Sequence, residues 1–452
     1  MHTSTAAPTG TGNLVLDFYD RMPEIVARCA TDPAPAAFTP GFALPELDDA
    51  VRAYFAVATA RWRPLADYRG HRVTLLDLTG NPGTHTTKTY ASLLIVARAV
   101  EHIRRTGRNI LIFSPTSGNK GVALRDAVLR ALDAGLATPE QLRVATLAPT
   151  TGRHKLRATR LSTDPRLRRL NPQLSYSGTD PETVKALARE FARDHAADYA
   201  RRYDTDVWFS LELANYMIAD AARALFEQRA DPIDAAARPR LHAHAVSSAF
   251  GLLGYHTGRA LLESTGEASP ASRPASLLVQ HLAAPDMVLS LRDRALLPAY
   301  ARDEAGGLFR RVGDDPHYPA VTYDPAEVLD PTFYTHRPPT SAAMNDLIAR
   351  HGGDGIVVSL AECIERYPHL RAWLSAAGVE LPADLRRLHE WSTVMAFTGF
   401  LNAADRGLLQ PDRDVVVHGT GHYAEGMYEP LCPGDLHPVT TTADIAAALS
   451  LA

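Results

Sequence analysis

Lysine is scarce in this chain, and so are cysteine and long apolar runs. The 452 residues contain 47 Lys and Arg together, and only four of these are lysines: Lys88, Lys120, Lys155 and Lys185. Arginine stays protonated in proteins, whereas a lysine amine can lose its proton and act as a nucleophile. A chain that uses arginine almost everywhere directs attention to the few places where it keeps lysine.

The other absences exclude several classes of protein. A formal net charge of −4 gives no support for nucleic-acid binding. No apolar run reaches the ~18 residues that a membrane span needs, and the first residues form no signal peptide. The three cysteines (Cys29, Cys363 and Cys432) match no metal-ligand spacing. We therefore expect a cytoplasmic protein with no metal site and neither a membrane nor a nucleic acid as partner.

The most informative stretch runs from Thr79 to Arg130. Lys88 stands at the expected start of a helix, an apolar run at 109–113 has the length of a strand, and Thr116 to Gly121 form a turn before a second helix. Gly118 permits that turn to be tight. Helix N-termini attract anions, and a lysine amine can form a Schiff base with an aldehyde. The stretch thus predicts an amine and a cluster of hydrogen-bond donors at two helix N-termini.

This pattern resembles the fold-type II pyridoxal 5'-phosphate (PLP) enzymes, threonine synthase and its relatives most of all. The shared residues are an Asn-Pro pair followed by Lys88, and then TSGN-x-G after the next strand. The resemblance implies that Lys88 carries PLP as a Schiff base (an aldimine) and, once freed, acts as the base at the substrate Cα. It also implies that Asn119 hydrogen-bonds the ring hydroxyl and that Thr116, Ser117 and Gly118 grip the substrate carboxylate.

Two later turns extend the resemblance. One follows an apolar strand and opens a helix, and it consists of Ser247, Ser248, Ala249, Phe250 and Gly251. The family binds the PLP phosphate at this place, and small residues let backbone amides approach an anion. The other turn contains Thr420 at the end of an apolar strand, where the family has a Ser or Thr beside the pyridine nitrogen. For both, an ordinary turn is the alternative.

Some residues depart from the family pattern. Lys88 is followed by Thr89 and Tyr90, where Asp-Arg is usual, and Lys120 stands where a small or hydroxyl residue is usual. Lys120 is predicted to bind a substrate carboxylate or side-chain anion, or else to be a solvated residue at a helix start. His85 is a further candidate for the substrate site, although 18 histidines place a few near any site by chance.

Strands and helices alternate along most of the chain, which predicts an α/β protein with parallel-rich sheets flanked by helices. The resemblance implies the two-domain, tryptophan synthase β-like architecture. We expect a helical N-terminal segment at 1–73 packed on a large cofactor domain at 74–107 and 233–452, with an irregular insertion near 300–356. The small domain is expected at 108–232. Within the N-terminal segment, 47–62 is expected to be a helix with Asp48 and Asp49 in its first turn.

The sequence therefore predicts a PLP-dependent lyase or transferase of amino-acid metabolism. It is expected to act on a small amino acid by β- or γ-elimination or replacement, as threonine synthase does, and to form a homodimer as many relatives do. The alternative is a non-catalytic or ligand-binding descendant of the same fold. Changed residues after Lys88 and a serine-rich phosphate turn are what such a descendant would show. The amino acid, its leaving group and the nucleophile stay open.

Overall fold

The computed structural model describes residues 9–29, 38–178, 182–233, 238–304 and 306–451. Contacts within the chain divide it into two compact units. Unit 1 comprises Met1–Leu14, Thr59–Gly80 and Asp220–Glu425, and unit 2 comprises Val15–Ala58, Asn81–Ala219 and Gly426–Ala452. The domain boundaries expected from the family resemblance remain a prediction. Within the described residues, no helix has the length and apolar character needed to cross a membrane.

Unit 1 is built on a seven-stranded sheet with the order β1-β2-β3-β14-β8-β9-β13. The strands are β1 (Gly10–Asn13), β2 (Thr59–Pro64), β3 (Val73–Asp77), β14 (Asp414–Gly419), β8 (Arg240–Ala245), β9 (Ala275–His281) and β13 (Gly353–Val358). From β3 to β13 the neighbours run parallel, whereas β1 and β2 pair antiparallel at the edge. Strands buried on both faces need apolar residues without alternation, which is why these central strands are recognisable in the sequence.

Helices cover both faces of this sheet, and β9 shows the two cores. Leu277 and Val279 pack into a core with α12 (Leu360–Ala376) and α13 (Ser392–Asp405). Leu278, between them in the sequence, faces the opposite core. That second core contains residues of α9 (Phe250–Ser264), α10 (Asp286–Leu291) and α11 (Ser341–His351). The two-residue period of a strand thus separates the two faces.

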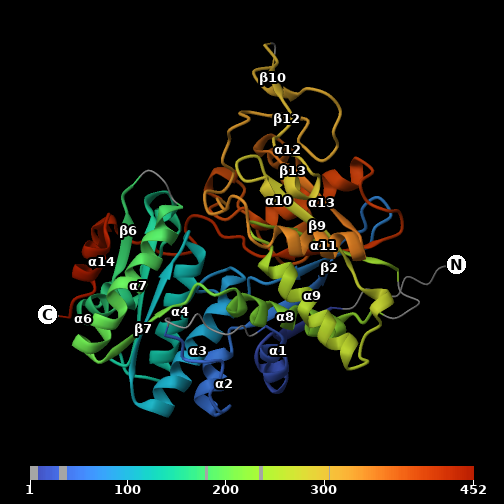
Figure 1. Cartoon of the computed structure of the whole chain (residues 1–452). Helices are drawn as coiled ribbons and strands as arrows, with labels where there is room; N and C mark the ends of the chain where they lie inside the picture. The colour runs from blue at the N-terminus through green and yellow to red at the C-terminus, as the bar shows by residue number, and fades with distance from the viewer. Residues whose placement is uncertain (1–8, 30–37, 179–181, 234–237, 305, 452) are drawn as a thin grey trace. The chain divides into compact units, whose positions relative to one another are not determined.

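The segment expected to be an irregular insertion is irregular only in its first part. There, β10 (Tyr300–Arg302), β11 (Phe309–Arg311) and β12 (Val321–Thr322) form a small antiparallel sheet of their own, which is visible in Figure 1. The rest contains α11 and most of β13, which joins the main sheet beside β9. The prediction missed β13 because its Gly353 and Gly355 break the apolar pattern by which a buried strand is recognised.

The expected helix over 47–62 is also only half correct. Asp48 caps α2 (Asp49–Phe55) by accepting a 2.7 Å hydrogen bond from the amide of Val51. The helix then ends, and the residues after Ala58 form β2. Trp62 pairs opposite Leu76 of β3, and inward-facing residues alternate with outward-facing ones along β2. This two-residue alternation, together with pairing to a buried neighbour strand, overrides the helical tendency of the Ala-rich stretch.

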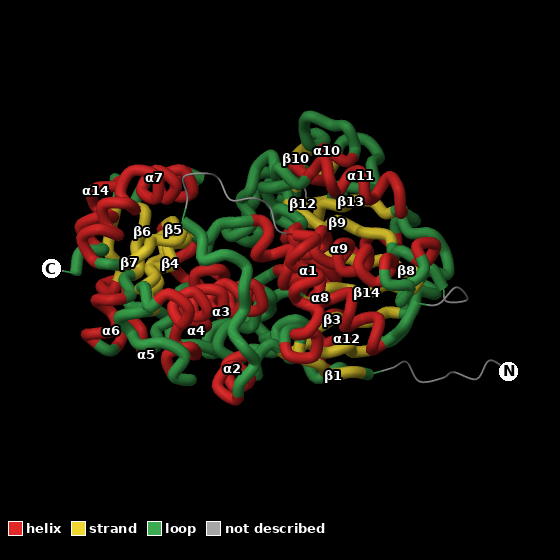
Figure 2. The backbone as a smooth tube through the Cα atoms, turned by 60° about the horizontal axis from the view of Figure 1, so that its bottom comes forward, coloured by secondary structure: helices red, strands yellow, loops and turns green. Residues whose placement is uncertain are grey.

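Unit 2 contains a five-stranded parallel sheet with the order β15-β6-β5-β4-β7. Its strands are β4 (Asn109–Pro115), β5 (Leu142–Pro149), β6 (Gln173–Tyr176), β7 (Thr205–Phe209) and β15 (Leu436–Val439). Figure 2 shows α7 (Thr183–Tyr203) and α14 (Thr442–Ala448) on one face of this sheet. The opposite face carries α3 (Lys88–Thr106), α4 (Asn119–Asp133), α5 (Arg160–Thr163) and α6 (Pro165–Leu170).

Two further helices lie near the start of unit 2 and at its boundary. α1 (Met22–Cys29) begins close to the N-terminus, and α8 (Leu213–Ala230) starts in unit 2 and ends in unit 1. Together, the two parallel-rich sheets flanked by helices confirm the predicted α/β class.

Candidate functional site

Lys88 is the first residue of α3, and the loop before it is held firmly within unit 2. Its amide donates to Thr86 Oγ1 at 3.1 Å. Asn81 accepts from the amide of Gly83 at 2.9 Å and donates to Asp126 of α4 at 2.8 Å. A Cβ on Gly83 would lie 2.2 Å from the Asp126 carboxylate, so only glycine fits there. The lysine loop is therefore clamped onto α4 from two sides.

The turn at Thr116 to Gly121 is closed by a side chain of its own. Thr116 Oγ1 accepts hydrogen bonds from the amides of Gly118 at 3.0 Å and Gly121 at 2.8 Å. Gly118 has a φ of 143°, a conformation that favours glycine. Lys155, which is fully buried, packs where a Gly118 side chain would be, with its Cβ 3.3 Å from that position. The turn that precedes α4 thus packs directly against buried Lys155.

A third lysine of the same unit accompanies Lys88. The Nζ atoms of Lys88 and Lys120 lie 5.4 and 5.6 Å from the ring centroid of Tyr216 on α8. Lys120 is only 6 % exposed, and its Nζ donates to the carbonyl of Ser210 at 3.2 Å. The pKa of Lys120 is lowered to about 7, mainly by burial and also by the charge of Lys88, while Glu212 opposes the shift. The expectation of a solvated Lys120 is therefore wrong.

Within unit 2, the structure brings together most of the predicted residues. Lys88 and Lys120 share a tyrosine ring, and Lys120 belongs to the same turn as Thr116, Ser117, Gly118 and Asn119. His85 lies in the clamped loop with a φ of 52°, a left-handed conformation that is uncommon outside glycine. Sequence reasoning missed Lys155, although the scarcity of lysine was the signal: three of the four lysines lie at this turn or beside Tyr216.

In unit 1, the turn predicted to bind phosphate connects β8 to α9. Ala249 caps α9 in a left-handed conformation, with a φ of 50°. Ser247 Oγ donates to Thr335 at 3.1 Å, and Thr340 donates to the carbonyl of Ser248 at 2.6 Å. Among the residues that the structure describes, the amides of Ser247, Ser248 and Ala249 donate to no other group. These amides and the start of a helix are the donor set that an anion requires.

Two polar side chains that sequence reasoning missed lie against this turn. A Cβ on Gly251 would meet Arg223 Nη1 and His244 Nε2, each at 2.7 Å. Arg223 belongs to α8, and the sequence does contain a signal for it. In a largely apolar helix, Asp220, Arg223 and Glu227 recur at a spacing of three and four residues, which places three charges on one helix face.

Thr420 follows β14 and is 6 % exposed. Its neighbour Gly421 exchanges hydrogen bonds with Thr393 of α13, at 3.1 and 3.4 Å, and these fix the turn. Since β14 and β8 are adjacent parallel strands, Thr420 and the turn at Ser247 both follow carboxyl ends at the same edge of the sheet. Ligands bind at this edge in open α/β sheets. His418, one of the histidines that flank Thr420, is instead buried and bonded to His242 at 2.8 Å.

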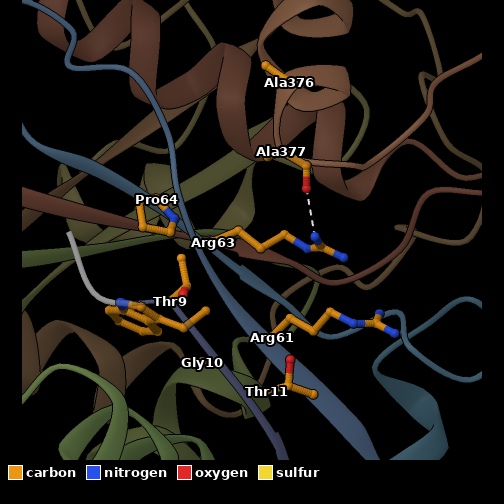
Figure 3. Close-up of a pocket in the computed structure, with 9 residues that line it drawn as sticks. Thr9, Gly10, Thr11, Arg61, Arg63, Pro64, Ala376 and Ala377 are labelled. Carbon is orange, nitrogen blue, oxygen red and sulfur yellow. Dashed lines mark hydrogen bonds between the residues drawn. The ribbon is translucent and has the colours of Figure 1, made fainter. Parts of the chain in front are cut away.

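A separate cavity of about 420 Å³ lies elsewhere in unit 1, beside β1 and β2. Figure 3 shows Arg61 and Arg63 along it, with Arg63 Nη1 donating to the carbonyl of Ala377 at 2.6 Å. Both arginines also approach Asp77, at 3.8 and 3.0 Å. None of the predicted site residues lines this cavity.

Comparison with solved structures defines the class of fold. Similar structures include threonine synthase from Escherichia coli, which is 16 % identical, with 88 % of this chain and 81 % of that chain covered and a TM-score of 0.53. Threonine synthase from yeast is 12 % identical, with 89 % and 75 % covered and a TM-score of 0.51. The fold is therefore that of threonine synthases, and the resemblance to fold-type II enzymes is confirmed at the level of the fold.

The sequence itself defines the family. Residues 10–452 match the family described as "Family of unknown function (DUF6002)", and the chain belongs to this family. No curated protein matches the sequence.

Proposed function

We propose that this chain is a PLP-dependent enzyme that acts on an amino acid by β- or γ-elimination or replacement. One observation supports this most: the amine of Lys88, at the first residue of α3, shares the ring of Tyr216 with Lys120, whose pKa is about 7. Lysine pairs of this kind suit covalent catalysis, because one cation makes it easier for the other amine to lose its proton.

The residues of each unit, considered separately, suit a part of PLP. Lys88 would hold its aldehyde carbon, and the open amides of Ser247 to Ala249, at the N-terminus of a 15-residue helix, would hold its phosphate. Because Gly251 has no side chain, the backbone of the turn packs directly against Arg223 and His244. Asn119 would bond the ring hydroxyl, and Thr420 would lie beside the ring nitrogen. When bound, PLP supplies an electron sink that stabilises negative charge at the Cα of an amino acid.

The chain's own groups then have separate tasks. The amine of Lys88 takes the proton from the substrate Cα. The turn from Thr116 to Lys120 binds the substrate carboxylate, because the helix dipole at the N-terminus of α4 favours an anion. Lys120 Nζ gives up its proton near neutral pH, which matches the need of a departing β- or γ-substituent for a general acid. The neutral hydroxyl of Thr420 would leave the ring nitrogen largely unprotonated, which would suit prompt loss of that substituent.

Borohydride trapping tests the proposal. The purified chain is mixed with PLP, the absorbance band of the bound cofactor is recorded, and borohydride then fixes the cofactor covalently for peptide mass spectrometry. We expect one modified peptide containing Lys88, and no modification in Lys88→Met. Lys185→Met removes a lysine of α7 and serves as the control, in which labelling persists. Labelling of Lys120 or Lys155 in place of Lys88, or a colourless protein, would contradict the proposal.

A second measurement separates an enzyme from a ligand-binding descendant. Amino acids and their O-acyl and O-phospho derivatives are added to the PLP-loaded protein, and the cofactor spectrum and the products are followed. An enzyme of the proposed kind shows a spectral shift and turnover with at least one of them, whereas a binding protein shows no turnover. The proposal includes a cytoplasmic location and a homodimer, and analytical ultracentrifugation tests the latter.

A further inference from the structure

Arg223 occupies an unusual place in unit 1. Its side chain is buried within the sheet-covering helix α8, and its guanidinium packs directly against Gly251 in the predicted phosphate turn. The two terminal nitrogens lie 2.7 and 3.1 Å from where a Gly251 Cβ would be. A fixed positive charge therefore lies against Gly251, two residues after the last of the three amides that are open to an anion.

Hydrogen bonds hold this guanidinium in place. Arg223 Nη1 donates to Nε2 of His244 at 3.2 Å and to Nδ1 of His418 at 3.1 Å. Its Nη2 donates to the carboxylate of Asp220 at 2.5 Å. These hydrogen bonds from both terminal nitrogens fix the plane of the guanidinium, which is therefore preorganised.

The donor-only character of arginine also determines the histidine tautomers. Because His418 Nδ1 accepts from Arg223, the neutral ring carries its proton on Nε2, which donates to Nδ1 of His242 at 2.8 Å. His242 must then donate from Nε2 to the carboxylate of Glu227 at 3.2 Å. Burial lowers the pKa of both His418 and His242, so both rings are neutral near physiological pH. The hydrogen-bonded chain thus runs in one direction, from Arg223 to Glu227.

The other charged groups of the hydrogen-bonded series lie at its opposite end from Arg223. Glu227 pairs with Arg240 at 2.7 Å and with the hydroxyl of Tyr255, and Arg240 also pairs with Asp231 at 2.8 Å. These ions lie at the far end of the hydrogen-bonded series, whereas the groups bonded to Arg223 beside the turn include His244, His418 and Asp220. A buried charge acts more strongly on a nearby anion than a solvated one does.

We propose that Arg223 is a positioning residue for the phosphate of PLP, acting through the backbone at Gly251 and held in register by His244 and His418. This rests on the proposed function. The cation against Gly251 strengthens the attraction of the turn's amides for a doubly charged phosphate. Gly251 is then required because any side chain there would displace the guanidinium.

The test compares PLP with pyridoxal, which has the same aldehyde and no phosphate. Dissociation constants of both are measured for the wild-type chain, for Arg223→Met and for Arg223→Lys. In Arg223→Met we expect the affinity for PLP to fall about 10- to 100-fold, the range for a lost interaction with a charged group. Pyridoxal affinity should stay unchanged, and Arg223→Lys should recover part of the loss. The phosphorus NMR signal of bound PLP should also move in Arg223→Met.

Two further variants show whether a lower PLP affinity in Arg223→Met reflects the lost charge or a general loss of structure. Gly251→Ala keeps the arginine but places a methyl group 2.7 Å from it, so it should lower PLP affinity and spare pyridoxal. Arg259→Met removes another buried arginine, one that bonds Gln228 and Ser272 further along α9, and it should leave the ratio of the two affinities unchanged.

The outcomes separate the two proposals. A wild-type chain that binds neither PLP nor pyridoxal would overturn the proposed function and this inference with it. A wild-type chain that binds PLP, with an unchanged PLP-to-pyridoxal ratio in Arg223→Met and Gly251→Ala, would overturn the inference alone. If Arg223→Met fails to fold, Arg223→Lys and Gly251→Ala decide by the same ratio.

Discussion

Arg223 and Arg240 in unit 1 and Lys120 in unit 2 are buried in opposite ways. In unit 1, Arg223 and Arg240 are buried together with carboxylates, at 2.5 Å from Asp220 and 2.7 Å from Glu227. In unit 2, Lys120 is buried against a carbonyl and a tyrosine ring, and no carboxylate of the described residues lies within ion-pair distance of it. Burial lowers the pKa of Arg240, but Glu227 and Asp231 raise it by more, whereas burial takes the pKa of Lys120 down to about 7.

This difference shows how one fold can hold both a permanent charge and an exchangeable proton. An arginine with a carboxylate partner keeps its charge at any working pH and can serve recognition of an anion. A lysine without such a partner titrates near neutrality and can serve proton transfer. The five predictions below start from this contrast and run from the largest expected effect to the smallest.

Removing a carboxylate from unit 1 should produce the largest effect. Glu227→Gln keeps the shape but leaves Arg240 with Asp231 as its remaining partner. Breaking a buried ion pair from one side destabilises a protein by about 3–5 kcal/mol, and we expect the lower end because Asp231 remains. Urea denaturation followed by circular dichroism measures this change. A variant as stable as the wild type would show that the pairing is not what makes burial of Arg240 tolerable.

A titration that measures the pKa of Lys120 tests the difference between this lysine and the paired arginines of unit 1 directly. With four lysines in the chain, ¹³C-methylation of the lysine amines gives a spectrum simple enough to follow with pH, and Lys120→Arg identifies its signal. In the cofactor-free protein that signal should titrate near pH 7. In Lys88→Met it should titrate at a higher pH, because the charge of Lys88 lowers the pKa of Lys120. A midpoint near the ordinary value of 10.5 would remove the contrast between the units.

The titration of Lys120 should also make the free energy of unfolding depend on pH. Since the pKa of Lys120 is about 7 in the folded chain and ordinarily 10.5, the unfolded chain binds more protons between these values. The free energy of unfolding should therefore rise with pH in this window, by up to about 1.4 kcal/mol per pH unit for one proton. Lys120→Met should lack this component, and the difference between the two proteins at each pH isolates it from other titrating groups.

Gly118→Ala tests the turn of unit 2 and should have a moderate effect. A non-glycine residue in a disfavoured backbone conformation costs about 1–3 kcal/mol, and the new methyl group would also press on Lys155 at 3.3 Å. Gly135→Ala, in the same unit, has a positive φ of 68° and no atom within 4 Å, so it reports backbone strain alone. Thermal unfolding should show Gly118→Ala to be the more destabilised of the two.

An exposed pair should show almost no effect. Arg193 and Asp194 lie 2.6 Å apart on the surface of α7, where solvent screens the attraction. Asp194→Asn should unfold at the same urea concentration as the wild type. If it loses as much stability as Glu227→Gln, burial does not explain why the Arg240–Glu227 pair contributes more to stability than an exposed pair.

Sequence patterns predicted the elements whose signal is local. Lys88, the turn from Thr116 to Lys120 and the turn after β8 each stand at a strand-to-helix junction, which short-range patterns identify. The same reasoning was wrong for β2, because 47–62 combines a helical start with a strand that pairs with distant β3. It also missed β13, whose two glycines conceal a strand that only its neighbour β9 stabilises.

The sequence by itself therefore determined which residues stand at helix N-termini and that Lys88 and Lys120 each stand at one, because both follow from residues close together in the chain. Only the tertiary structure decided that Arg223 lies against Gly251 and that Lys120 is buried beside Tyr216. Both depend on how separate elements pack. The charge of a buried amine or guanidinium follows from the partners that packing brings to it, which no local pattern specifies.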